Sequence, residues 1–193
     1  MRWVIAENKL DVQQRTFVQG NAIDSGCHWI KGFPGSGKSV LLLYTLKRIK
    51  NRFPNAKVAF VVFTQSMIEM FKNAFIEAGT AADVMTMYQY LKTCQQYDFV
   101  LCDEVQDMTP RILNAMKSRC QHVIVAGDEN QSIYDSDPQF HEPTLQPSQL
   151  LSILSGTSHE LTTIHRLTKE IIRCVNLLLP NMNIFGSSRI PGA

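Results

Sequence analysis

Short apolar runs alternate along this chain with longer stretches in which apolar residues recur every three or four positions. The short runs predict strands, and two of them, Val58–Phe63 and Val123–Ala126, are apolar at nearly every position. Such continuous apolar character is typical of strands that helices cover on both faces. The predicted strands are His28–Lys31, Lys57–Phe63, Asp83–Thr86, Phe99–Cys102, His122–Ala126 and Glu160–Thr163.

Helical periodicity fills the intervals between these strands. The predicted helices are Lys38–Asn51, Gln65–Ala78, Met87–Gln95, Pro110–Ser118, Gln149–Leu154 and Lys169–Leu179. Strands and helices that alternate at this spacing predict an α/β fold, with a parallel sheet, right-handed crossovers and helices on both faces in three α/β/α layers. Ligands of such sheets bind beyond the carboxyl ends of the strands.

Two segments lack either periodicity. Asp135–Pro147 contains three prolines and few apolar residues, so we expect a long loop there. Pro180–Ala193 is rich in small and turn-forming residues, and we expect a linker-like or disordered end. The sequence thus predicts one domain that ends at Leu179.

Composition adds little about partners. The net charge of +2 is too small to indicate a nucleic-acid or membrane surface. The five cysteines are scattered and contain no C-x-x-C pair, which favours reduced thiols and a cytoplasmic location. No segment is apolar over the ~20 residues that span a bilayer, so we expect no membrane partner.

The first candidate for chemistry is the run from Gly32 to Ser39, which fits the phosphate-binding pattern G-x-x-x-x-G-K-[ST] between a predicted strand and a predicted helix. Backbone N–H groups of such a loop surround the phosphates of a nucleotide, and the helix N-terminus adds to the attraction. We expect the phosphate cradle at Gly32, Gly35, Ser36, Gly37, Lys38 and Ser39, with Lys38 on the outer phosphates and Ser39 on Mg²⁺.

Carboxylates follow the buried run Phe99–Cys102. The predicted topology brings this strand end beside the phosphate loop, so we expect Asp103 to hold Mg²⁺ and Glu104 to deprotonate the attacking water. Asp107 has two interpretations, a cap of the next helix or a structural partner, besides a chemical role. Gln131 follows the next strand and is a candidate sensor of the γ-phosphate.

Taken in order, the motifs resemble the first RecA-like domain of superfamily 1 helicases of the UvrD/Rep type. The resemblance covers Leu10 to Leu179 and rests on Gln14, GFPGSGKS, Val62-Phe63-Thr64, Val84-Met85-Thr86, DEVQD, GDENQSIY and Ile164-His165-Arg166.

The resemblance implies further roles. Gln14 would read the adenine edge, and His165 stands where relatives carry a tyrosine that stacks on adenine. Gln131 and Arg166 would contact the γ-phosphate, so that the implied catalytic residues are Lys38, Glu104, Gln131 and Arg166. Phe63, Thr64, Thr86 and Tyr134 would lie along nucleic acid, although Phe63 is equally well explained as a core aromatic.

Some positions depart from the family pattern. Gln65 and Ser66 replace an Asn-Lys pair, Val40 replaces an arginine, and Asp135-Ser136-Asp137 stands where relatives have arginine and a base-stacking aromatic. The short span between Thr86 and Asp103 leaves no room for the accessory domain that many relatives insert there.

Two functions remain open at this point. The first is the motor domain of an ATP-dependent helicase or translocase, with ATP and Mg²⁺ as cofactors and single-stranded DNA, or alternatively RNA, as partner. We expect a second RecA-like domain outside this chain to complete the site, and a nuclease is a further candidate partner. The second function is a nucleotide-binding regulatory module that switches a partner without translocating; Asp135 and Asp137 favour it slightly.

Overall fold

A six-stranded parallel sheet forms the centre of the domain in the computed structural model, which describes residues 4–20, 23–24, 26–128, 135–180, 184 and 187–190. The strands lie in the order β3-β2-β4-β5-β1-β6, and each neighbouring pair is parallel. Their bounds are β1 His28–Gly32, β2 Val58–Val62, β3 Asp83–Thr86, β4 Phe99–Cys102, β5 His122–Gly127 and β6 Thr157–Leu161.

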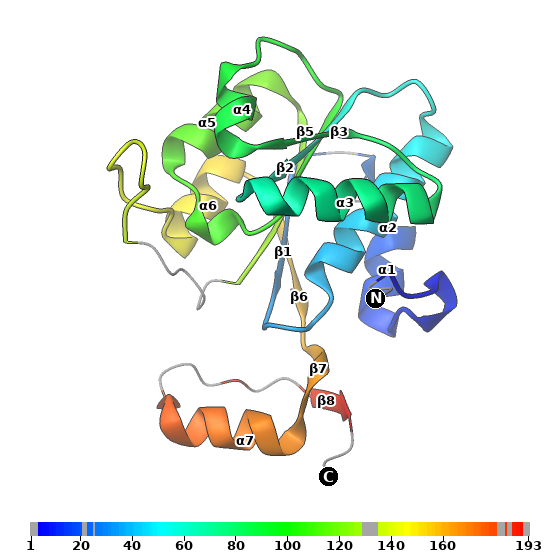
Figure 1. The fold of residues 1–193 in the computed structure, drawn as a ribbon, viewed down its shortest axis with the longest axis vertical. Helices are drawn as coiled ribbons and strands as arrows, with labels where there is room; N and C mark the ends of the chain where they lie inside the picture. The colour runs from blue at the N-terminus through cyan, green and yellow to red at the C-terminus, as the bar shows by residue number, and fades with distance from the viewer. Residues whose placement is uncertain are drawn as a thin grey trace.

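Helices cover both faces of this sheet (Figure 1). On one face pack α1 (Val12–Gln19), α2 (Lys38–Arg52) and α3 (Gln65–Ala78), and on the other α4 (Met87–Lys92), α5 (Pro110–Arg119) and α6 (Pro147–Leu154). Strand β2 shows why its sequence is apolar throughout: Phe60 enters the first core, whereas Ala59 and Val61 enter the second. The predicted three-layer α/β architecture is confirmed.

The last predicted strand differs from the structure. We expected one strand at Glu160–Thr163, but β6 ends at Leu161 and a separate strand β7 (Thr163–Thr168) continues the chain away from the sheet. The polar sequence Thr157-Ser158-His159-Glu160 concealed β6, because β6 is the edge strand of the sheet and most of its side chains are not buried.

The C-terminal segment also differs over its described part, where we expected a linker-like end. Strand β8 (Ser187–Ile190) pairs with β7 in parallel, and α7 (Lys169–Leu178) connects the two strands. This small layer lies apart from the six-stranded sheet in Figure 1. It is held by the cluster Phe33, Ile164, Ile172 and Ile184, whose first member belongs to the candidate phosphate loop. Sequence patterns did not indicate a pairing between segments so far apart in the chain.

The loop before α6 is organised around Asp137, whose side chain is 0% exposed. One carboxylate oxygen accepts backbone N–H bonds from Gln139 and Phe140 at 2.9 and 2.7 Å, and the other accepts the Tyr88 hydroxyl at 2.8 Å. Asp137 is one of the two residues that slightly favour a regulatory module in the sequence. The structure weakens that argument for Asp137, because its carboxylate is buried and bonded to its own loop and to α4.

Replacing this carboxylate should cost stability. Asp137→Ala removes the acceptor of three partly buried hydrogen bonds, so we expect the free energy of unfolding to fall by about 2 kcal/mol. Urea denaturation of the variant and wild type measures the difference. The matched control is Asp135→Ala, since Asp135 lies in the same loop with an exposed side chain. Equal losses in the two variants would contradict the structural role of Asp137.

No helix in the described ranges is long and apolar enough to cross a bilayer.

Candidate nucleotide-binding site

The phosphate loop connects β1 to α2, as the sequence predicted. Gly37 is the N-cap of α2 and has a left-handed backbone with φ of 87°. This conformation favours glycine, and a Cβ atom at this position would also collide with Nε2 of the Gln14 side chain. The Ser36 side chain is fully buried, and its hydroxyl has no hydrogen-bond partner among the described residues. A buried polar group of this kind within the loop fits a site made for an anion.

Lys38 is the cation of this loop, and its side chain is only 7% exposed. Its ammonium donates hydrogen bonds to the carbonyl oxygens of Gly32 at 2.7 Å and Phe33 at 3.3 Å. These bonds hold the ammonium group against its own loop, close to the N-terminus of α2. Phosphate groups at this helix end would meet backbone N–H groups and the ammonium together.

The end of β4 meets the phosphate loop. The Ser39 hydroxyl donates a hydrogen bond of 2.7 Å to Oδ2 of Asp103, a residue that is 1% exposed. Burial, and then the neighbouring Glu104, raise the pKa of Asp103 to about 7, while the Ser39 hydroxyl and Lys38 act in the opposite direction. A cation beside this carboxylate would favour its ionised form.

The Ser39–Asp103 pair fits Mg²⁺. This ion usually takes one or two carboxylates from a protein and further oxygens from phosphates and water. No group of three or more His, Cys, Asp or Glu side chains that could hold a metal ion exists in the described part of the chain. One carboxylate and one hydroxyl therefore suit an ion that also coordinates nucleotide phosphate.

Glu104 follows directly and has an unusual backbone. It is a non-glycine residue in the left-handed region, with φ of 55° and ψ of 49°, and it caps the one-turn helix η3 (Val105–Asp107). Such conformations carry strain and are common at active sites. Its side chain is half-buried, and Oε2 accepts a 2.7 Å hydrogen bond from Nε2 of Gln106. The carboxylate predicted to act as base is thus held by a neighbour.

Asp107 is buried and Nε2 of Gln106 lies 3.3 Å from its Oδ2. The N-cap of α5 is Thr109, so the structural partner is the interpretation of Asp107 that the geometry favours.

Gln14, in α1, contacts the phosphate loop at Ser36 and is 1% exposed. Its Oε1 accepts the Asp11 backbone N–H at 3.0 Å and its Nε2 donates to the Ser36 carbonyl at 2.9 Å. Both ends of the amide are therefore bonded to protein, and the side chain that the resemblance assigns to adenine supports the phosphate loop in this structure.

Strand β7 also touches the loop. The His165 backbone N–H donates to the Gly35 carbonyl at 2.8 Å, and its imidazole Nε2 lies 2.9 Å from Oδ2 of Asp11. The next residue, Arg166, is exposed, and its backbone lies close to Gly35. A Cβ atom built on Gly35 would lie 2.6 Å from the Cβ atom of Arg166. The structure thus brings His165 and Arg166 to the phosphate loop from more than a hundred residues away in sequence.

The predicted nucleic-acid residues lie at the carboxyl ends of β2 and β3. Phe63 is partly buried against the second core, and Thr64 is exposed. Thr86 is 8% exposed, and its hydroxyl caps α4 by accepting the Gln89 backbone N–H at 3.3 Å. Gln131 and Tyr134 lie outside the described residues.

Two residues of the site carried no role in the sequence analysis. Asp11 is the N-cap of α1, and its spacing to Gln14 forms a capping box that the sequence does signal. Gln106 joins two strand ends, and no local pattern indicates this.

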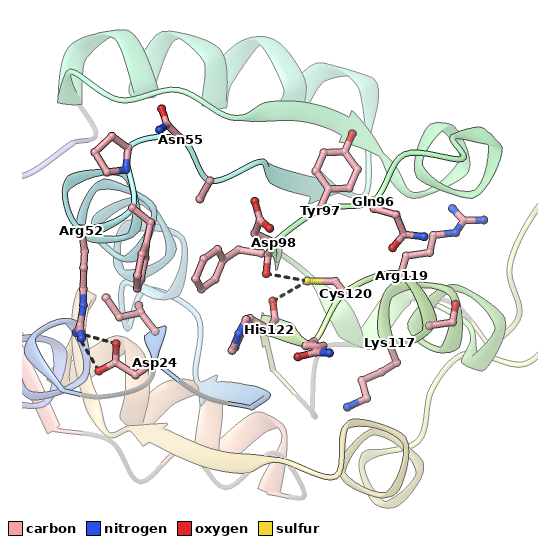
Figure 2. Close-up of a pocket in the computed structure, with 17 residues that line it drawn as sticks. Asp24, Arg52, Asn55, Gln96, Tyr97, Asp98, Lys117, Arg119, Cys120 and His122 are labelled. Carbon is pink, nitrogen blue, oxygen red and sulfur yellow. Dashed lines mark hydrogen bonds and ion pairs between the residues drawn. The ribbon is translucent and has the colours of Figure 1, made fainter.

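A large pocket of about 930 Å³ lies elsewhere, at the amino ends of β4 and β5 (Figure 2). Two contacts join polar groups of its lining: Arg52 pairs with Asp24 at 2.7 Å, and the Cys120 thiol lies 3.3 Å from the carbonyl oxygen of Asp98. Burial raises the pKa of Cys120 to about 11, so its thiol stays protonated at neutral pH. The pocket is at the opposite edge of the sheet from Lys38 and takes no part in the nucleotide site.

Solved structures share this fold at low sequence identity. They include the PRRSV helicase (17% identity, TM-score 0.58), a complex of the arterivirus nonstructural protein 10 helicase with DNA (18%, 0.56), and the Pif1 helicase from Candida albicans (17%, 0.56). The matches cover 91%, 88% and 90% of this chain and 38%, 43% and 44% of those chains, respectively. This chain therefore spans less than half the length of each of these structures.

The sequence itself matches a family directly. No curated protein matches this chain. Residues 28–174, however, match the family described as the viral superfamily 1 RNA helicase core domain, a range that contains the phosphate loop, Asp103, Glu104 and Arg166. The predicted superfamily is confirmed. The chain belongs to the viral superfamily 1 RNA helicase core domain family, and its six-stranded sheet with the flanking helices forms a RecA-like domain of that family.

Proposed function

We propose that this domain is the ATP-binding motor domain of a superfamily 1 helicase that couples ATP hydrolysis to movement along single-stranded nucleic acid. The observation that carries the proposal is the 2.7 Å hydrogen bond between Ser39 of the phosphate loop and Asp103 at the end of β4. It joins a phosphate-binding loop to a buried carboxylate, and this combination supports nucleotide binding with a metal ion.

Each polar group has a separate task in this proposal. Lys38 donates to the β- and γ-phosphates, together with the backbone N–H groups at the start of α2. Mg²⁺ held by Ser39 and Asp103 would neutralise phosphate charge. Glu104 accepts the proton of the attacking water, and Arg166 donates to the γ-phosphate, with Gln131 as sensor.

Recognition of the base is assigned differently from the sequence analysis. The buried Gln14 amide is bonded to Asp11 and Ser36, whereas the His165 side chain is 26% exposed at the edge of the loop. We therefore assign contact with the nucleotide base to His165. Gln14 would contact the base only if nucleotide binding broke its hydrogen bonds to Asp11 and Ser36.

Nucleic acid would pass the carboxyl ends of β2 and β3, along Phe63, Thr64 and Thr86, with Tyr134 farther along the chain. A second RecA-like domain would complete both the nucleotide site and this track, and we propose a cytoplasmic setting. The burial of Asp137 removes an argument for the regulatory-module alternative.

The test is the ATPase rate of the full-length protein with and without single-stranded oligonucleotides. We expect stimulation by single-stranded DNA or RNA, because a motor couples the two sites. Parallel titrations with the two polymers decide which is preferred, and a blunt duplex serves as control. ATP hydrolysis that no single strand stimulates would contradict the motor and favour the regulatory module.

A further inference from the structure

Gln106 lies between two functional strand ends and is 6% exposed. It is the middle residue of η3, the one-turn helix that follows Glu104 and precedes α5. Three hydrogen bonds involve its side-chain amide. Nε2 donates to Glu104 Oε2 at 2.7 Å and to Asp107 Oδ2 at 3.3 Å, and Oε1 accepts the Asp128 backbone N–H at 3.2 Å.

These partners fix the orientation of the amide. The two carboxylates can accept hydrogen bonds when ionised but cannot donate them, and a backbone N–H can only donate. Rotating the amide by half a turn would direct its oxygen at two carboxylates and its NH₂ group at another donor. The side chain is therefore held in one orientation, and so is the Glu104 oxygen bonded to it.

The end of β5 is shaped to admit this side chain. A Cβ atom on Gly127 would lie 2.5 Å from Oε1 of Gln106 and 2.9 Å from Cγ1 of Val105. Any other residue at this position would have to displace the Gln106 amide and the Val105 side chain from their present places. The close approach brings Gln106 into contact with β5 immediately before the segment that contains the proposed sensor Gln131.

We infer that Gln106 is a positioning residue that orients the Glu104 carboxylate for its proton transfer and connects it to the end of β5. The inference rests on the proposed function, because it needs Glu104 to act as the base. In this role Gln106 acts through Glu104 and not on the nucleotide itself. Its contribution comes from holding a strained residue in one geometry, and misplacement of a catalytic group by about 1 Å can cost a rate on the order of 10²-fold.

Two substitutions in the full-length protein separate the halves of the amide. Gln106→Glu keeps an acceptor for Asp128 but places a third carboxylate against Glu104 and Asp107, whereas Gln106→Ala removes both halves. We expect both variants to lower kcat for ATP by about 10- to 100-fold. The dissociation constant for the nucleotide should stay at the wild-type value, because Lys38 and Ser39 are unaffected. Gln95→Ala, at an exposed glutamine, is the matched control.

A double variant and an exchange measurement make the assignment specific. If Gln106 acts through Glu104, adding Gln106→Ala to Glu104→Gln lowers kcat no further. Hydrogen–deuterium exchange at the Asp128 amide should accelerate in Gln106→Ala and remain slow in Gln106→Glu.

The outcomes distinguish the two proposals. If the Gln106→Ala variant hydrolysed ATP at the wild-type rate, the role of Gln106 would be overturned and the proposed function would stand. A full additional loss in the double variant would also overturn it, since Gln106 would then act independently of Glu104. A wild-type protein with no ATP hydrolysis would reject the proposed function, and the positioning role with it.

Discussion

Lys38→Ala should abolish measurable nucleotide binding. The Lys38 ammonium is buried within the phosphate loop, 2.7 Å from the Gly32 carbonyl, and on binding it would exchange that neutral partner for phosphate oxygens. Hydrogen bonds to charged groups contribute about 1.5–3 kcal/mol each, and two phosphate contacts would therefore be worth about 3–6 kcal/mol. This corresponds to a loss of affinity of at least about 100-fold.

Titration of a fluorescent ATP analogue or calorimetry measures this loss. Lys72→Ala is the control, because Lys72 lies on the exposed surface of α3 and pairs with Glu69. Circular dichroism shows whether the variant is folded, which matters because Lys38 also bonds its own loop. A folded Lys38→Ala protein with wild-type affinity would refute the assignment of the phosphate site.

Glu104→Gln should keep nucleotide affinity and lose turnover. Glutamine has the same shape, but its amide is no proton acceptor at neutral pH, so general base catalysis is removed. Such catalysis typically contributes about 10²–10⁴-fold, and we expect kcat to fall within that range. Binding should persist because Lys38, Ser39 and Asp103 hold the phosphates and the metal ion in the proposed site.

Single-turnover hydrolysis measured beside equilibrium binding separates the two effects. Glu69→Gln on the surface of α3 is the matched control, since its carboxylate is exposed and pairs only with Lys72 among the described residues. Turnover at the wild-type rate in Glu104→Gln would show that another group accepts the proton. A loss of binding instead would show that Glu104 holds the nucleotide.

The central sheet was largely predictable because its strands carry their burial in their own sequence. Val58–Val62 and Phe99–Cys102 are buried on both faces and apolar throughout. Edge strands do not follow this rule. β6 is polar at most positions, so the sequence pattern did not predict its first residues. β8 pairs with β7, from which the whole of α7 separates it in the chain.

The nucleotide site divides in the same way. Lys38 and Ser39 belong to a local pattern in which glycine and helix geometry set the chemistry. Asp103 and Glu104 could be located because parallel strands end at one edge of the sheet. The function of Gln14 could not be inferred in the same manner, since its partner Ser36 lies 22 residues away.

The phosphate loop, the parallel α/β fold, the superfamily and the residue types available for catalysis could all be predicted from the amino-acid sequence. The hydrogen-bond partners of the buried polar side chains became known from the three-dimensional packing: Gln14 bonds Ser36, Asp137 bonds Tyr88, and Gln106 bonds Glu104 and Asp128. The physical reason is that periodicity and turn chemistry act over a few residues. The partner of a buried amide or carboxylate is instead set by the order of strands in the sheet, which joins segments distant in the chain.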